Sequence, residues 1–230
     1  MELKDRIIVA LDVDSLDKAG LLVEMLAPHV GCFKVGLELL TAVGAPMVVD
    51  FVHSLGGQVF FDGKFDDIPN TVGKASKTVA AMDVKMFNVH ASAGIEAMQA
   101  AVDNKGHSLV LAVTVLTSLD ENNASLIFGT SVKAKVLQLA RDAQIAGCDG
   151  IICSPQELEF LGRQKELASM IKITPGVRPN WADVGDQKRV MTPLEAIKAG
   201  ATAVVVGRPI TEPPAHIGTP VDAVERIFWK

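Results

Sequence analysis

The chain has 230 residues, of which 49% are hydrophobic and 21% are charged, and its formal net charge is −5. This composition is typical of a folded globular protein and excludes a long disordered arm. The acidic balance, without a run of Lys or Arg, excludes the basic stripe that binding to nucleic acid needs. The first residues include charges and no long apolar segment, so we expect no signal peptide, no membrane span and a cytosolic location.

Eight short apolar runs recur along the chain and predict eight strands. In chain order they span residues 7–11, 32–35, 59–61, 86–89, 109–115, 150–153, 171–173 and 203–206. Segments of helical periodicity lie between them and after the last, at residues 16–26, 46–55, 72–82, 93–102, 132–146, 156–161, 193–199 and 221–228. Strands and helices therefore alternate from one end of the chain to the other.

This alternation predicts an α/β protein with parallel strands and right-handed crossovers. Eight repeats in 230 residues fit a single (β/α)8 TIM barrel that spans residues 1–230 as one domain. An open, doubly wound sheet is the alternative. It is disfavoured because the first strand runs into Asp12 without the glycine-rich turn that binds a dinucleotide pyrophosphate.

The apolar residues fit a sheet that is covered on both faces. A mean hydropathy of +0.30 is high for a globular protein, and parallel strands with helices on their outside explain it because they are continuously apolar. The three cysteines, Cys32, Cys148 and Cys153, lie in apolar stretches without a zinc-like spacing. We therefore expect buried thiols and no metal site.

Polar residues at the carboxyl ends of the predicted strands indicate the site, because the active sites of such barrels lie there. Asp62 and Lys64 follow the third strand two residues apart, which places them on the same side of an extended chain. Asp67 comes three residues later and can approach the same ammonium, while Lys34 on the second strand adds another cation. A purely structural ion-pair network is the alternative, disfavoured because each buried charge costs several kcal/mol before pairing.

A second polar cluster follows the seventh and eighth strands, where barrels often bind a phosphate group. Arg178 and Arg208 each lie near a glycine, and Gln187 between them supplies an amide donor. Two guanidinium groups and free backbone N–H groups suit a dianion. The alternative is that both arginines are solvated surface charges.

Residues 62–71, Asp-Gly-Lys-Phe-Asp-Asp-Ile-Pro-Asn-Thr, resemble the signature of the orotidine monophosphate decarboxylase family in its bacterial form, the last enzyme of de novo UMP synthesis. The resemblance extends over nearly the whole chain, through residues 10–12, 34–36, 88–91, 115–118, 153–155, 174–179, 186–187 and 206–210. Asp66 departs from the pattern, because bacterial members often have His there. His90, which follows the fourth strand, is expected to support the site at most and not to act as a catalyst.

The resemblance implies a carboxy-lyase that converts orotidine 5'-monophosphate to UMP without a cofactor or a metal. It implies that Lys64 protonates the ring carbon that loses carbon dioxide, within a charge array that includes Asp62, Asp67 and Lys34. Asp62 is also expected to lie against the substrate carboxylate.

The resemblance also implies a binding site for the rest of the nucleotide and a homodimer. The residues expected to bind substrate are Asp12 and Lys34 for the ribose, Thr117 for the pyrimidine, and Arg178, Gln187, Gly207 and Arg208 for the phosphate. Asp67 and Thr71 are expected to reach into the site of the neighbouring subunit.

Two other functions stay open at this point. A metal-dependent sugar-phosphate decarboxylase or aldolase has a similar barrel and a similar third strand, but its magnesium site generally draws an acidic ligand from the second strand. Lys34 stands at that place here and would repel a cation. The other alternative is a non-catalytic nucleotide-binding barrel that retains only the phosphate contacts.

Overall fold

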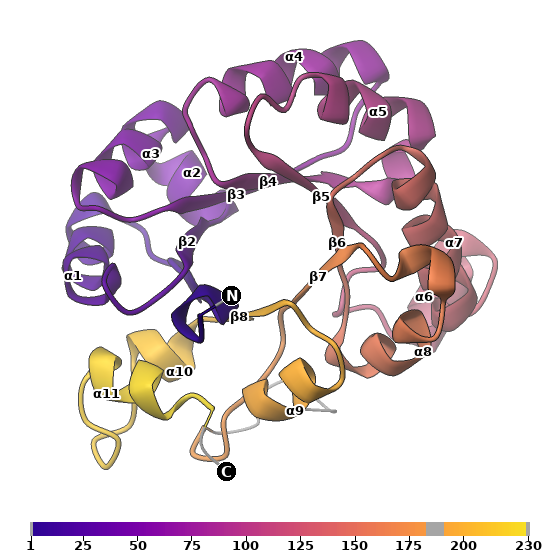
Figure 1. Ribbon diagram of the computed structural model, residues 1–230. Coiled ribbons are helices and arrows are strands. Elements are labelled where there is room, and N and C mark those ends of the chain that lie inside the picture. Colours follow the sequence, from indigo (N-terminus) through magenta and orange to yellow (C-terminus); the bar gives the residue numbers. More distant parts are fainter. Residues whose placement is uncertain (1, 183–190, 229–230) are drawn as a thin grey trace.

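The computed structural model describes residues 2–182 and 191–228 of the chain. Its strands are parallel and form a closed barrel in sequence order, with helices around the outside (Figure 1). The strands are β1 (Ile7–Ala10), β2 (Cys32–Val35), β3 (Val59–Phe65), β4 (Met86–His90), β5 (Leu109–Val113), β6 (Gly150–Ile152), β7 (Ile171–Thr174) and β8 (Ala203–Val206). The predicted barrel is confirmed.

The helices follow the strands in the predicted alternation. They are α1 (Leu16–Leu26), α2 (Leu37–Val43), α3 (Ala45–Ser54), α4 (Pro69–Ala80), α5 (Ile95–Asp103), α6 (Glu121–Phe128), α7 (Val132–Ile145), α8 (Leu158–Gly162), α9 (Pro193–Lys198), α10 (Arg208–Thr211) and α11 (Pro220–Arg226). Short 3-10 helices span Lys4–Arg6, Ala91–Ala93, Pro155–Glu157 and Lys165–Leu167. Sequence periodicity did not predict α2, α6 and α10, which are short and bury few apolar side chains.

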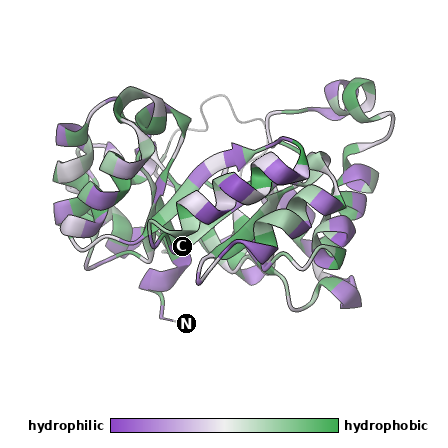
Figure 2. Cartoon of the chain, turned by 90° about the horizontal axis from the view of Figure 1, so that it is seen from above, coloured by the Kyte–Doolittle hydropathy of each residue, from purple (hydrophilic) through white to green (hydrophobic). Residues whose placement is uncertain are grey.

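The barrel wall separates two apolar layers. Side chains alternate along each strand, so that Ile8 and Ala10 of β1 point into the barrel while Ile7 and Val9 pack against the helices. The inner layer fills the middle of the barrel with Ile8, Ala10, Cys32, Phe60, Met86, Leu111, Ile173, Ala203 and Val205. Hydrophilic residues cover the outer faces of the helices (Figure 2). The barrel therefore has a packed core, and polar groups can gather only above it.

The three cysteines are buried, as the sequence predicts. Burial raises the pKa of each thiol to about 12. These thiols are therefore protonated at neutral pH and serve as small core residues.

Helices α2 and α3 are separated by Gly44 alone, and the chain bends by 104° between them. Gly44 has φ 99°, a conformation that favours glycine. Among the described residues, no single helix has the length and apolar composition of a membrane span, although this bent pair meets both criteria together.

Candidate active site

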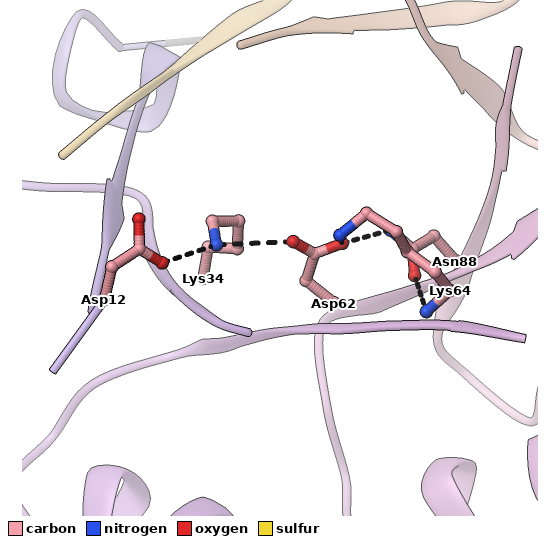
Figure 3. Close-up of polar contacts among 5 residues, drawn as sticks. All are labelled: Asp12, Lys34, Asp62, Lys64 and Asn88. Carbon is pink, nitrogen blue, oxygen red and sulfur yellow. Dashed lines mark hydrogen bonds and ion pairs between the residues drawn. The ribbon is translucent and has the colours of Figure 1, made fainter. Parts of the chain in front are cut away.

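Four charged side chains of alternating sign form a row at the carboxyl ends of β1, β2 and β3 (Figure 3). The ammonium of Lys34 lies 2.9 Å from Asp12 Oδ1 and 3.3 Å from Asp62 Oδ2. The ammonium of Lys64 lies 2.8 Å from Asp62 Oδ1. We call Asp12, Lys34, Asp62 and Lys64 the charge array.

The period of the strands explains why these residues meet. Asp12, Lys34 and Asp62 each come two residues after a side chain of the inner apolar layer, namely Ala10, Cys32 and Phe60. Successive inward positions on a strand are two residues apart, so the three polar residues form the next layer above the core. The sequence motif and the fold together therefore place the array in the mouth of the barrel.

The centre of the charge array is more buried than its ends. The side chain of Asp62 is 8% exposed and that of Lys34 is 14% exposed, whereas those of Lys64 and Asp12 are 30% and 59% exposed. Burial alone would lower the pKa of Lys34, but the carboxylates of Asp62 and Asp12 raise it above its usual value. Lys34 is therefore an ammonium at neutral pH, and Asp62 is a buried carboxylate with two cationic partners.

Lys64 lies in an irregular part of β3. Phe61 pairs with Phe87 of β4, and Phe65 pairs with Val89, so four steps along β3 correspond to two steps along β4. Within this bulge Lys64 has φ 49°, the left-handed conformation that non-glycine residues rarely adopt. Asp62 and Lys64 do meet as the sequence predicts, but the regular extended chain assumed there is wrong.

The bulge is packed from behind by aromatic rings. The ring centroids of Phe61 and Phe65 are 6.0 Å apart, and those of Phe65 and Phe87 are 6.1 Å apart. A Cβ atom at Gly63 would come within 2.5 Å of the Phe61 ring. Glycine is needed at this position because the rings close over it.

Asn88 of β4 joins the charge array, although no role was predicted for it from the sequence, where it belongs only to the family-like segment 88–91. Its Nδ2 donates a hydrogen bond to Asp62 Oδ1 at 2.6 Å, and its Oδ1 accepts one from the backbone N–H of Lys64 at 2.7 Å. Asn88 is fully buried and stands two residues after Met86 of the inner layer. A polar residue at an inward-facing position of an apolar strand was the signal that could have indicated Asn88.

His90 is half-buried at the end of β4, near the charge array. Burial lowers the pKa of its imidazole; the carboxylate of Asp66 opposes this shift and the ammonium of Lys64 adds to it. The imidazole is thus neutral at physiological pH. This residue borders the array without a hydrogen bond to it in the described part of the chain.

Asp67 and Thr71 lie on the segment that leaves β3, and both are exposed. The carboxylate of Asp67 accepts a hydrogen bond from the backbone N–H of Ile68 at 2.7 Å. Among the described residues it forms no ion pair with Lys64. Within one chain, therefore, the structure does not bring Asp67 to the array.

The predicted phosphate cluster lies beyond β7 and β8, and β8 pairs with β1 next to the charge array. Arg178 follows β7 and is half-buried, whereas Gly207 and Arg208 follow β8 directly. Burial and the positive charge of Arg208 both lower the pKa of Arg178, so the two guanidinium groups lie close enough to repel each other. A Cβ at Gly207 would lie 3.7 Å from Asp12 Oδ2, which places this glycine beside the array. Gln187 lies outside the described residues.

Thr117 lies on the exposed segment between β5 and α6. The nearby Thr114 is buried, and its hydroxyl donates to the carbonyl of Ile152 at 2.9 Å, which ties the end of β5 to β6. Thr117 thus comes after β5, whereas the charge array comes from β1 to β3, and no hydrogen bond or ion pair joins the two within residues 2–182 and 191–228. Over residues 2–182 and 191–228, no group of three His, Cys, Asp or Glu side chains is arranged to hold a metal ion.

Comparison with known proteins decides the family. The model of the orotidine 5'-phosphate decarboxylase / HUMPS family matches residues 5–227. The chain belongs to this family. The orotidine 5'-phosphate decarboxylases of Heliobacterium modesticaldum and Moorella thermoacetica are each 45% identical to it, over 99% and 93% of this chain and 96% and 88% of theirs.

A solved structure agrees with the family assignment. The crystal structure of orotidine 5'-phosphate decarboxylase from Lactobacillus acidophilus is 32% identical, with a TM-score of 0.79, and the match covers 97% of this chain and 99% of that one. The resemblance seen in the sequence is thereby confirmed, as is the prediction of a carboxy-lyase. In this family member, the ends of β1 to β3 carry an internally paired array, and Arg178 and Arg208 beyond β7 and β8 form no ion pair with a carboxylate of residues 2–182 or 191–228.

Proposed function

We propose that this protein decarboxylates orotidine 5'-monophosphate to UMP, with Lys64 as the proton donor and without a cofactor or a metal ion. The observation that carries the proposal is the ammonium of Lys64, held 2.8 Å from the buried carboxylate of Asp62 in the mouth of the barrel. Family membership and relatives named for this activity support it over nearly the full chain.

The reaction needs a cation at one fixed place. When the bond between the ring carbon and the carboxyl group breaks, its electron pair stays on the ring as carbon dioxide leaves. A fixed ammonium stabilises this developing negative charge, and Lys64 Nζ then gives a proton to the same carbon. The amine that remains regains its proton from water, so the cycle needs no oxidant or reductant.

Asp62 and Lys34 prepare the site for this step. Asp62 is a buried carboxylate, so a substrate carboxylate bound beside it would meet a like charge that disappears when carbon dioxide leaves. Lys34 neutralises part of the charge on Asp62 and separates it from Asp12. The array thus holds the carboxylate of Asp62 in place before substrate arrives.

Binding of the remote parts of the nucleotide supplies further free energy. Enzymes lower barriers by about 8 to 23 kcal/mol, which one lysine does not provide, so contacts far from the reacting carbon must contribute. We assign the phosphate to Arg178, Gln187, Gly207 and Arg208, the ribose to Asp12 and Lys34, and the pyrimidine to Thr117. The electrostatic repulsion between Arg178 and Arg208 supports a dianion that both would bind.

The metal-dependent alternative is disfavoured by the position of Lys34. Its ammonium lies between the carboxylates of Asp12 and Asp62, within 3.3 Å of both. A magnesium ion needs oxygen ligands around it, and an ammonium at that point repels the ion. The non-catalytic alternative does not explain why Lys64 and Asp62 are paired beside the open mouth.

The test is an ultraviolet absorbance assay of the purified protein with orotidine 5'-monophosphate, with and without EDTA. We expect the orotate absorbance to decay at the same rate with and without EDTA. Lys64→Ala should lower this rate by about 10⁴-fold, because proton donation and charge stabilisation are lost together. UMP should still bind to this variant.

Lys105→Ala is the matched control, because it breaks another Lys–Asp pair, 2.6 Å long, at the amino end of the barrel. It should retain the wild-type kcat. Stable absorbance with wild-type protein, or a decay that EDTA abolishes and magnesium restores, would contradict the proposal.

We further propose that the active form is a homodimer in which Asp67 and Thr71 act in the neighbouring site. Both residues are exposed in the single chain, and the intervening Ile68 is 65% exposed, which is unusual for a large apolar side chain. Leu37, at the start of α2, is also 55% exposed at the carboxyl end of the neighbouring strand. A second subunit would cover these side chains and bring Asp67 toward Lys64.

Mixing inactive variants tests this arrangement. If Asp67 acts across the interface, Lys64→Ala and Asp67→Ala subunits together form one intact site per mixed dimer, and about a quarter of all sites in a random dimer mixture recover. A mixture of Lys64→Ala with Asp62→Ala is the control and should stay inactive, because these two residues belong to one chain. No recovery in the first mixture would show that Asp67 acts within its own subunit or not at all.

A further inference from the structure

The bulge in β3 leaves the backbone at Lys64 without a regular ladder partner. Residues 62–64 stand opposite Asn88 alone, because the pairing of the strands passes directly from Phe61 and Phe87 to Phe65 and Val89. Bulged residues lie off the ladder, so their backbone N–H groups need other acceptors when they are buried.

The side chain of Asn88 supplies the missing partner. Its carbonyl oxygen accepts the Lys64 N–H at 2.7 Å, and its amide nitrogen donates to Asp62 Oδ1 at 2.6 Å. A primary amide offers an acceptor and a donor from one planar group, which suits both contacts at once. Asn88 is fully buried, so water does not compete for either hydrogen bond.

The backbone of Lys64 also needs support of this kind. Its φ of 49° is unfavourable for a residue with a side chain, and such conformations persist only where surrounding contacts hold them. Asn88 bonds the backbone of Lys64, while Asp62 bonds the ammonium at the far end of the same side chain. Lys64 is thus fixed at its backbone by Asn88 and at its ammonium by Asp62, and the Asn88 amide also bonds Asp62.

We infer that Asn88 is a positioning residue that aims the ammonium of Lys64 by fixing its left-handed backbone and the carboxylate of Asp62. The inference rests on the proposed role of Lys64. Asn88 itself has no contact with the open mouth of the barrel, since it is fully buried, so it acts on the reaction only through these two residues. A small misplacement of a reacting group is costly to the rate.

The first experiment measures kcat and KM for orotidine 5'-monophosphate with Asn88→Ala. We expect kcat to fall by about 10²-fold, with KM changed by less than about threefold, because the contact serves the transition state and not nucleotide binding. Ser108→Ala is the matched control, since it removes another buried hydrogen bond, from Ser108 Oγ to the Val84 carbonyl at 2.7 Å. The control should keep the wild-type kcat.

A second variant, Asn88→Asp, separates positioning from general loss of structure. A protonated carboxyl group accepts and donates as the amide does, whereas the ionised group has no donor and repels Asp62. The ratio of variant to wild-type kcat should therefore rise as pH falls. A merely structural role predicts a ratio that does not change with pH, and this variant remains informative if Asn88→Ala does not fold.

The outcomes separate the two proposals. Wild-type protein that leaves orotidine 5'-monophosphate unchanged refutes the proposed function, and the inference falls with it. An active wild type with full kcat in Asn88→Ala, or with a loss confined to KM, refutes the inference alone. A crystal structure of Asn88→Ala in which Lys64 keeps its positive φ and its ammonium has not moved would also refute it.

Discussion

The two sides of the barrel mouth differ in how their charged side chains are paired. On the side of β1 to β4, each charge of the array has a partner of opposite sign in the same chain. On the side of β7 and β8, Arg178 and Arg208 lie near each other, and neither forms an ion pair with a carboxylate in residues 2–182 or 191–228. The charges of the array balance one another, whereas the two arginines have no counterion within the part of the chain that the structure describes.

This difference fits the separate tasks of reacting and binding. Groups that act on a transition state are most effective when they are held in place in advance, which internal pairing achieves. Groups that bind an anion gain affinity when their charges are not already satisfied within the protein. Under the proposed function, the mouth would combine a rigid reactive side with an open side that binds the phosphate dianion.

Removal of one member of the paired side should have the largest effect on stability. Lys34→Met leaves the buried Asp62 with one cation fewer, and we expect the free energy of unfolding to fall by about 3 kcal/mol. Urea titration measures it. Lys18→Met is the control, because Lys18 pairs with Asp14 at 2.8 Å on the exposed surface, and it should cause no measurable change. Equal stability of Lys34→Met and wild type would show that the ion pairs of the array do not stabilise the fold.

Removal of one arginine should instead act on affinity. We expect Arg208→Ala to raise KM for the phosphorylated substrate by about 10- to 100-fold, the value of a charge-assisted hydrogen bond. Binding of unphosphorylated orotidine should not change. Arg163→Ala, which removes an exposed arginine at the C-terminal end of α8, is the control. Equal losses for nucleotide and nucleoside would remove Arg208 from the phosphate site.

Arg208→Ala should affect stability much less than Lys34→Met does. Its loss relieves repulsion of Arg178, so the free energy of unfolding should stay the same or rise slightly in the absence of ligand. Inorganic phosphate should raise the Tm of the wild type and have a weaker effect on the variant. A clear loss of stability without ligand would show that the arginine side is also internally paired.

The barrel and most of the site could be predicted because their signals are local. Apolar runs with a period of two predict the strands, and polar residues just beyond them fall at the mouth by the geometry of the barrel. Asp12, Lys34 and Asp62 follow this rule directly. Helix α6 could not be predicted because its only buried residue is Ala124, whereas Leu126 is 85% exposed, so it lacks an apolar face toward the core.

The role of Asn88 and the bulge could not be predicted because they depend on contacts between strands. No local pattern shows that β3 holds two more residues than β4 between paired positions. The sequence pattern predicts a regular strand and indicates polar groups at strand ends, where His90 lies and Asn88 does not. Asp67 is a different case, because its predicted partner lies in another subunit.

The left-handed backbone at Lys64 has a consequence for engineering. Glycine adopts this conformation without steric cost, so the position to which we assign the proton donor is one where the fold alone favours glycine. A library selected only for heat resistance should therefore enrich for substitutions at position 64 that relieve backbone strain and inactivate the enzyme. A selection for thermal tolerance should therefore also require the reaction product for growth, so that variants without activity are removed.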